Sequence, residues 1–300
     1  MFSLSTSWNS AIRRNGADIV NEIKGIGFDT IELNFALNEA VCAQILSLKE
    51  SGAIKVSSLH NICPLPEEIE PEVASPDYYS LASPDSEERG LAIDATKNTV
   101  RWAARLGAKA VVLHIGRVQV KERTRDLAAL AGDKTAFEEL RLQMICEREE
   151  KKGGYLDNAM KSLGELAPFA KENGIFLGIE NRYHFREIPL QDELEIIFKN
   201  FPPGTVYYWH DVGHAEAFER LGLAKHKESL ERFSNRLLGV HLHDIIGMIG
   251  DHRAPGTGTF DFSILKPYIK KETIKVIEAH QPATAADIRR AVKYLTKILG

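Results

Sequence analysis

The feature that most constrains this chain is a strand-like segment that recurs eight times, each followed by a stretch with helical periodicity. Short apolar runs rich in β-branched residues predict strands at residues 2–7, 29–35, 54–61, 109–116, 175–181, 205–211, 237–244 and 274–280. Helical periodicity is clearest in residues 92–108 and 155–175, each with a helix-stop glycine before the next strand. Eight such repeats predict an α/β fold, a closed parallel (β/α)8 barrel, with a doubly wound sheet as the structural alternative.

No linker or shift in composition divides the chain, so we expect one barrel domain over residues 1–300. Two segments interrupt the regular alternation. Residues 64–90 are rich in proline and acidic residues, and residues 117–154 form a charged helical stretch. Both follow the carboxyl ends of predicted strands, so we expect them near the barrel mouth, where active sites of such barrels are built.

Composition indicates a soluble globular protein, with 44% hydrophobic and 27% charged residues. The amino-terminal residues lack the basic and apolar regions of a signal peptide, and no apolar run reaches the roughly 20 residues of a membrane helix. Cys42, Cys63 and Cys146 are widely spaced and suggest reduced thiols. We therefore expect a cytoplasmic location and no membrane partner. The net charge of −4 gives no general attraction for nucleic acid, so we expect no such partner.

Polar side chains stand at nearly every predicted strand end. They include Glu32, His60, His114, Glu180, Asn181, Arg182, Asp211, His214, His241, His243, Asp244, Glu278 and His280, with Asp251 and His252 just beyond strand seven. Taken singly, each fits a solvated or hydrogen-bonded structural group, and we interpret Glu32, His184, His210 and His226 in that way. Taken together, they would crowd charge into one cavity unless a cation neutralised it. Mixed Glu, Asp and His sets suit Mn²⁺, Zn²⁺, Co²⁺ or Mg²⁺, so we predict a divalent metal cofactor.

Several motifs occur in an order and spacing that resemble the xylose isomerase-like TIM-barrel superfamily. They are "LHIG", "GIENR", "DVGHA", "HLHD", "DHRAPGTGTFDF" and "VIEAH", and the resemblance covers essentially the whole chain. This superfamily contains sugar and sugar-phosphate isomerases, sugar epimerases and apurinic-site endonucleases. The resemblance implies a metal-dependent enzyme whose substrate is a small sugar or sugar phosphate.

The resemblance also implies roles for individual residues. The metal set shared by the superfamily falls on Glu180, Asp211, His241 and Glu278. Further metal-ligand positions of the endonucleases fall on His60 and His114, and the last-loop histidine falls on His252. His214 matches a position that binds substrate in the epimerases and a second metal in the endonucleases.

One departure from the endonuclease pattern concerns an aspartate that should lie two residues before His252. The chain has Gly250 at that position, and Asp251 comes one position late. This displacement puts a full three-zinc cluster in doubt.

The expected chemistry follows from two carboxylates that face each other at a metal. Glu180 and Glu278 would act as the catalytic pair, one removing a proton from the carbon beside a carbonyl and the other returning it. The metal would polarise the substrate oxygens and stabilise the enediolate, giving isomerisation or epimerisation. His214 would hold a hydroxyl or the developing oxyanion.

Other pocket residues keep alternative roles. His243 shares a strand face with His241, so it could line the pocket, orient its neighbour or simply pack. Arg182 and Arg253 could grip a phosphate or carboxylate of the substrate, or form salt bridges. Residues 254–262, "APGTGTFDF", predict a tight loop that needs glycine close to the ligand. The loop lacks the context of a nucleotide-binding motif, so we expect no nucleotide cofactor.

Two other functions stay open at this point. One is a multi-zinc apurinic-site endonuclease. The extra histidines favour it, whereas the displaced Asp251 and the acidic mouth segments argue against it. The other is a non-catalytic, metal-dependent sugar-binding barrel. Neither the substrate nor the oligomeric state can be derived from the sequence, although homo-oligomers are common among such barrels.

Overall fold

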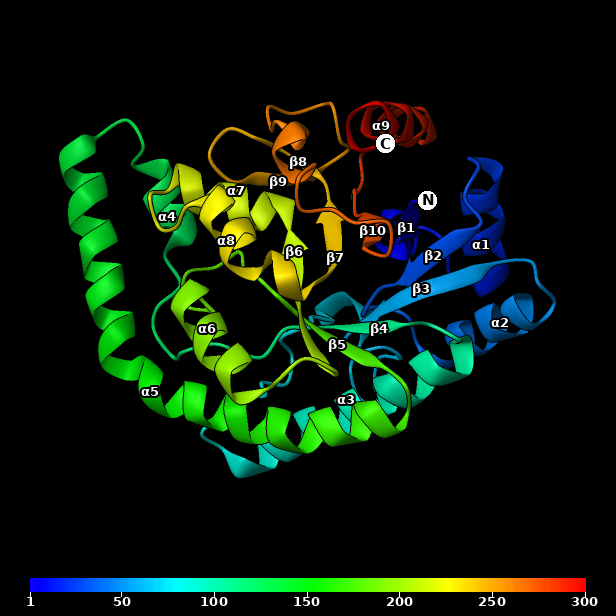
Figure 1. Ribbon diagram of the computed structural model, residues 1–300, viewed down its shortest axis with the longest axis horizontal. Helices are drawn as coiled ribbons and strands as arrows, with labels where there is room; N and C mark the ends of the chain where they lie inside the picture. The colour runs from blue at the N-terminus through cyan, green and yellow to red at the C-terminus, as the bar shows by residue number, and fades with distance from the viewer.

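Eight parallel strands close into a barrel in the computed structural model, which describes residues 1–300 (Figure 1). The strands are β1 (Ser3–Ser5), β2 (Thr30–Leu33), β3 (Lys55–His60), β4 (Ala110–Leu113), β5 (Phe176–Glu180), β6 (Val206–Asp211), β7 (Leu237–Leu242) and β10 (Ile274–Ile277). Each lies inside its predicted segment. Because β1 pairs with both β2 and β10, the sheet has no edge, and the predicted barrel is confirmed over the doubly wound alternative.

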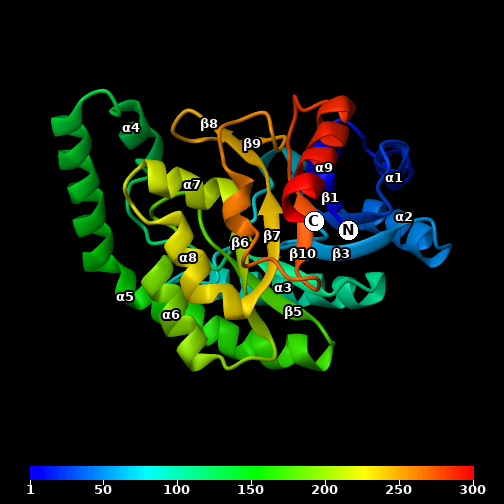
Figure 2. The ribbon, with the colours of Figure 1, turned by 45° about the horizontal axis from the view of Figure 1, so that its top comes forward.

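Helices surround the barrel, as Figures 1 and 2 show. They are α1 (Gly16–Gly25), α2 (Glu39–Glu50), α3 (Ser86–Leu106), α4 (Thr124–Ala129), α5 (Lys134–Glu172), α6 (Gln191–Asn200), α7 (Val212–Arg220), α8 (His226–Phe233) and α9 (Ala285–Leu299). The alternation is irregular at one place. Two helices, α7 and α8, follow β6, whereas only a short 3-10 turn, Phe262–Leu265, lies between the hairpin after β7 and strand β10. No helix combines the length and the apolar character needed to cross a membrane.

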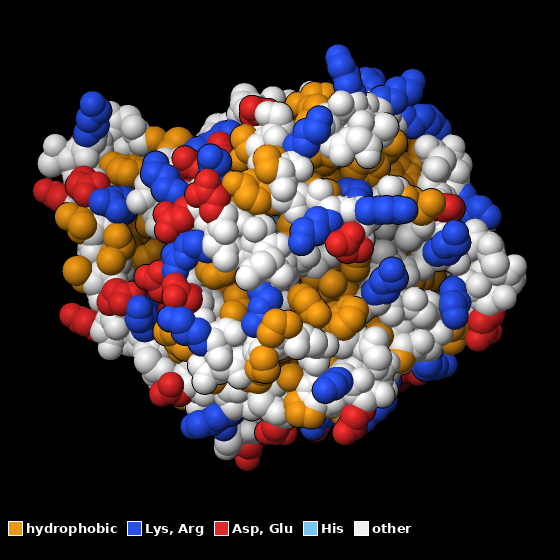
Figure 3. Space-filling view, viewed as in Figure 1, with side chains coloured by type: hydrophobic (Ala, Val, Ile, Leu, Met, Phe, Trp, Pro, Cys, Tyr) orange, Lys and Arg blue, Asp and Glu red, His pale blue; other side chains and the backbone are white.

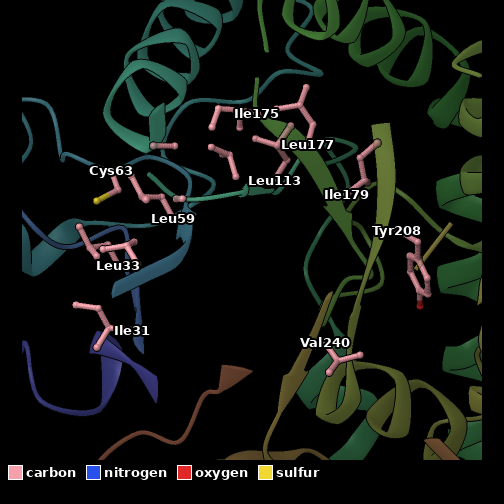
Figure 4. Close-up of a cluster of buried hydrophobic side chains, with 14 of the residues drawn as sticks. Ile31, Leu33, Leu59, Cys63, Leu113, Ile175, Leu177, Ile179, Tyr208 and Val240 are labelled. Carbon is pink, nitrogen blue, oxygen red and sulfur yellow. The ribbon is translucent and has the colours of Figure 1, made fainter. Parts of the chain in front are cut away.

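Alternation along each strand creates two cores. Residues such as Ile31, Leu59, Leu177 and Val240 belong to the large cluster that fills the space between barrel and helices (Figure 4). A small second cluster contains Ala110, Val112, Trp209, Ile274 and Val276. These side chains alternate with the outer set and fill the barrel interior, so the polar residues one step further along the strands reach the mouth.

Trp209 is the largest member of the interior cluster and is fully buried. A Cβ atom at Gly178 or Gly239 would lie 2.9 Å or 2.3 Å from its ring. Glycine at these two positions on the neighbouring strands therefore makes room for the indole. The ring of His241 lies against the indole, with 5.1 Å between centroids, so Trp209 forms the floor of the polar mouth.

The two predicted interruptions follow β3 and β4. Residues 64–85 form a loop that carries Asp77 back to the mouth, where its carboxylate contacts His114. Residues 117–154 contain α4 and the first half of α5. The sequence predicted a separate helix from residue 155, but α5 runs unbroken through Gly153 and Gly154 as 39 residues and changes direction along its length (Figure 1). Nothing lies within 4 Å of a Cβ built at either glycine.

Candidate metal centre

Three residues of the candidate centre lie on neighbouring strands, each two positions after a residue at the Trp209 layer of the barrel interior. Glu180 follows Gly178 on β5, Asp211 follows Trp209 on β6, and His241 follows Gly239 on β7. The period of two therefore turns the three side chains toward the barrel axis, above the interior core. Glu278 follows the last residue of β10 and completes the set. One oxygen or nitrogen from each of these four residues lies within 4.8 Å of those from the other three.

His241 Nδ1 is the centre of this group. It lies 2.5 Å from Glu180 Oε1, 3.0 Å from Glu278 Oε2 and 3.7 Å from Asp211 Oδ2. All four side chains are buried. Three carboxylates thus converge on one ring nitrogen, in a place where water cannot screen their mutual repulsion.

The electrostatics of the group favour a bound cation. Burial opposes a charge on His241, but the carboxylates of Glu278, Glu32 and Glu180 outweigh it and raise the histidine pKa well above its ordinary value. Burial likewise opposes ionisation of Glu180 and Glu278, yet the His241 charge holds the pKa of both carboxyls well below the usual range. One imidazolium cannot balance several buried carboxylates. The donor set therefore fits a divalent cation held by two glutamates, one aspartate and one histidine.

Metal binding should release protons, since His241 must lose a proton to offer Nδ1 to a cation. Its raised pKa keeps it protonated at neutral pH, whereas the lowered carboxyl pKa values leave Glu180 and Glu278 ionised. We expect release of about one proton per ion bound, and an affinity that rises with pH until His241 deprotonates. Calorimetric titrations of Mn²⁺ in buffers of different ionisation enthalpy will count the protons. Binding without release would contradict this protonation state.

Glu32 fixes the orientation of His241, a role that the sequence did not reveal. Its side chain is fully buried, and His241 donates its Nε2–H to Glu32 Oε1 at 2.9 Å. Ser58 donates its hydroxyl to the other Glu32 oxygen at 2.6 Å. This contact directs Nδ1 toward the three converging carboxylates and increases the basicity of the ring.

Replacing Glu32 with glutamine should weaken metal binding about 10- to 100-fold, because the ring keeps an acceptor but loses the negative charge behind it. Titration of metal-free protein with Mn²⁺ will measure the effect. Glu50→Gln, at the exposed end of α2, serves as a control with the same charge change. An unchanged affinity in Glu32→Gln would show that His241 needs no such support.

A second group of possible ligands lies beside the first and shares Glu180. His114 Nε2 lies 2.7 Å and His60 Nε2 3.4 Å from Glu180 Oε2. His114 Nδ1 lies 2.9 Å from Asp77 Oδ2. Burial and the nearby Arg182 oppose a charge on His114, but Asp77 and Glu180 raise its pKa. The predicted positions His60 and His114 are thus brought together at the mouth.

Arg182 supports this second group through a salt bridge with Asp77. The guanidinium is buried and binds Asp77 Oδ2 at 2.5 Å and Glu187 Oε1 at 3.1 Å. Of the two roles that the sequence left open, the structure thus shows a salt bridge. Arg182 holds Asp77, and Asp77 holds His114, so the arginine positions a member of the centre.

A third group contains His214, His243 and His252, whose ring nitrogens lie within 4.8 Å of one another. The backbone N–H of His252 donates to His243 Nδ1, so the proton of His243 sits on Nε2, which donates to both Asp211 oxygens at 2.8 and 2.9 Å. His243 therefore orients Asp211. A Cβ on Gly213 would lie 2.1 Å from the His243 ring, so a glycine is required next to it.

The displaced Asp251 nevertheless reaches this third group. Its Oδ2 lies 2.9 Å from His252 Nδ1 and 3.9 Å from His214 Nε2. Residues Asp244–Ile246 (β8) and Gly250–Arg253 (β9) form an antiparallel hairpin with a register shift, and His252 has a φ of 53°. In this hairpin the Asp251 carboxylate therefore contacts His252 and lies near His214. Burial opposes a charge on His252, but Asp251 raises the pKa of its imidazole to about 9.

The glycine-rich loop surrounds the carboxylate of Asp244, a contact that the sequence did not predict. Asp244 is buried and accepts hydrogen bonds from the backbone N–H groups of Ile245, Gly256, Gly258 and Phe260. A Cβ at Gly258 would lie 2.4 Å from Asp244 Oδ1. The glycines are therefore needed for close approach to this carboxylate.

The remaining histidines divide between the centre and the outer wall. His280, noted at a strand end but given no role, lies with His252 and Glu278 in a fourth group of possible ligands. His210 and His226 bond to each other behind the barrel wall, with 2.9 Å between their Nε2 atoms, and His184 pairs with Glu122. These last three stay outside the centre, as expected. Arg253 is half-buried beyond His280 and makes no ion pair.

The closed parallel barrel and the carboxylates and imidazoles at its mouth define the class of the molecule, a (β/α)8-barrel protein with a potential metal site at the carboxyl ends of its strands. The profile of the Xylose isomerase-like TIM barrel family matches residues 20–298. The chain belongs to this family.

Similarity to individual proteins is distant but extends over the whole barrel. Uncharacterized protein MJ1614 of Methanocaldococcus jannaschii is 22% identical over 267 residues, which cover 87% of each chain. A D-tagatose 3-epimerase-like protein superposes with a TM-score of 0.69 at 19% identity, over 99% of this chain and 96% of that one. An L-ribulose 3-epimerase gives 0.69 at 15% identity, over 100% and 95%. At these identities the structural similarity establishes the fold.

Proposed function

We propose that the protein is a divalent-metal-dependent isomerase or epimerase of small sugars or sugar phosphates. The observation that carries this proposal is the convergence of Glu180, at the end of β5, and Glu278, just after β10, on His241 Nδ1 at 2.5 and 3.0 Å. Two carboxylates so placed can serve the two faces of one substrate carbon. The similarity of the fold to proteins described as D-tagatose 3-epimerase-like and L-ribulose 3-epimerase supports this reaction class.

Each residue of the centre has a distinct role in the proposed reaction. Glu180 and Glu278 exchange a proton with the carbon beside the substrate carbonyl, one removing it and the other returning it. His214, beside Asp211 and Asp251, holds a substrate hydroxyl or oxyanion. When bound, the divalent cation polarises the carbonyl and lowers the energy of negative charge on its oxygen. Glu180, Asp211, His241 and Glu278 would hold that cation.

The test is exchange of hydrogen with solvent. Metal-loaded protein is incubated in D₂O with a panel of ketoses and ketose phosphates, and deuterium at the carbons beside the carbonyl is followed by NMR. We expect label at one carbon, together with appearance of the epimer or aldose. Absence of exchange with every member of the panel, at full metal occupancy, would contradict the proposal.

A second function, apurinic-site endonuclease, is supported by one observation. The groups around His60 with His114 and around His214 with His252 lie beside the four-residue set, and Asp251 contacts the latter group despite its displacement. Against it, the chain has a net charge of −4, and on the face in Figure 3 acidic side chains lie among the basic ones over much of the surface. Metal-loaded protein is mixed with a duplex containing one abasic site. Incision with about three zinc ions per chain would favour the endonuclease, and an intact duplex with one ion the isomerase.

A further inference from the structure

A cavity of about 410 Å³ opens beside the candidate centre, between the segments that follow β1 and β2. Its size suits a small metabolite. One wall is Phe35, whose ring lies 5.6 Å from that of His60, centroid to centroid. Another wall is His280, which stacks on His252 at 3.9 Å. Both walls touch histidines of the groups beside the candidate centre, so a substrate chain that begins between Glu180 and Glu278 would have room to continue into this cavity.

Polar groups inside the cavity suit a polyol chain. Asn34 lines it, is 5% exposed, and donates its Nδ2–H to Ser10 Oγ at 3.0 Å. The Asn34 Oδ1 atom has no hydrogen-bond donor. A buried amide oxygen without a donor is unfavourable, and a ligand hydroxyl would supply one. Ser7 and Asn38 offer further hydroxyl and amide groups along the same cavity.

Two adjacent arginines on the cavity wall differ in their pairing. Arg13 uses Nε and Nη2 to bind Glu22 at 3.0 and 2.9 Å, so its charge is balanced within the protein. Arg14 lines the same cavity and makes no ion pair or side-chain hydrogen bond. The only carboxylate on the lining is the exposed Glu72, and it lies more than 4.0 Å from both guanidinium groups. Arg14 is exposed, so its unpaired guanidinium is free to bind an anion at the rim of the cavity.

From these features we infer that the substrate is a polyol with an anionic terminus, a phosphate or a carboxylate, and that Arg14 binds this terminus. A guanidinium matches either group with two parallel hydrogen bonds. The other arginines near the mouth do not compete for it, since Arg182 is engaged by Asp77 and Glu187, and Arg253 lines a separate cavity behind His280. This inference rests on the proposed function and adds the chemical class of the substrate.

Binding of unreactive polyols tests the inference without turnover. Metal-loaded protein is titrated calorimetrically at low salt with sorbitol, sorbitol 6-phosphate and gluconate. We expect one or both anionic polyols to bind about tenfold or more tightly than sorbitol. The better of the two identifies the terminus. Equal affinity for all three would overturn the inference.

Variants locate the effect. Arg14→Gln should weaken binding of the anionic polyol about 10- to 100-fold and leave sorbitol unchanged. Glu72→Gln should strengthen anionic binding, and Lys24→Gln, the same charge change in the last turn of α1, should leave it unchanged. An anionic preference that survives in Arg14→Gln would also overturn the inference.

The results separate this inference from the function it rests on. Binding that depends on Arg14, in a protein that exchanges no substrate hydrogen, would support the anionic subsite and contradict the isomerase. Exchange with neutral ketoses at the same rate as with their phosphates would support the isomerase and contradict the subsite.

Discussion

Replacing Glu278 with glutamine is expected to lower turnover of the proposed reaction about 10²- to 10⁴-fold, the range that one general acid or base contributes. Glutamine keeps the shape of the side chain and an oxygen near His241 Nδ1, but it cannot take or return a proton. Rates of solvent deuterium exchange at saturating Mn²⁺ will measure the loss. Saturation matters because the same substitution removes one anionic donor from the metal set.

The control for this prediction lies on the same stretch of chain. Glu272 is exposed just before β10, at the opposite end of the barrel from Glu278. Glu272→Gln should keep the activity and the thermal stability of the parent protein. Exchange that persists unchanged in Glu278→Gln would remove this residue from the catalytic pair, whereas absence of exchange in the parent protein would favour the non-catalytic sugar-binding alternative.

Local sequence pattern was sufficient to predict the barrel and the main polar set. Each strand is a short apolar run, and strand side chains alternate with a period of two, so a polar residue at a strand end predicts an inward position. That reasoning reached Glu180, Asp211 and His241, and the resemblance to a known superfamily selected the same residues. In the structure, Glu180 and Asp211 both lie near one atom of the third residue, His241 Nδ1.

The supporting residues could not be predicted because their contacts join distant parts of the chain. Glu32 and His241 are 209 positions apart, and only closure of the barrel places β2 where its glutamate reaches across to β7. Asp77 lies in an irregular loop and gives no periodic signal before it meets His114 and Arg182. Such groups set the orientation and charge of the residues that bind a metal.

In the hairpin after β7, the sequence pattern indicated which residues are polar but not which residues they contact. The sequence showed three histidines and a glycine loop, and suggested that the glycines approach a ligand. In the structure their N–H groups converge on the buried Asp244. Counting positions back from His252 could not show that Asp251 contacts this histidine, because a register shift in β8 and β9 changes which side chains face each other.

Replacing Arg148 with methionine is expected to lower the free energy of unfolding by about 3–5 kcal/mol, the usual cost of removing one partner from a buried ion pair. Arg148 and Glu193 are 0% and 1% exposed, and two guanidinium nitrogens meet the carboxylate at 2.6 and 2.8 Å. The pair joins α5 to α6, and Arg148 also donates to the Glu187 backbone oxygen. Urea unfolding followed by circular dichroism will measure the loss.

The double variant Arg148→Met/Glu193→Gln distinguishes a stranded charge from lost packing. Glutamine still accepts the N–H of Leu190 that Glu193 Oε2 accepts at 2.7 Å, yet it carries no charge. If the cost arises from an unpaired buried carboxylate, the double variant should recover about 1–3 kcal/mol of the loss. A double variant no more stable than Arg148→Met would instead assign the cost to the packing of the arginine side chain. Arg148 is also connected to the candidate centre, since it binds the backbone of Glu187, whose carboxylate binds Arg182. Arg182 in turn binds Asp77, which contacts His114. Weaker metal binding in Arg148→Met would therefore show that helix α5 supports the centre from outside the barrel.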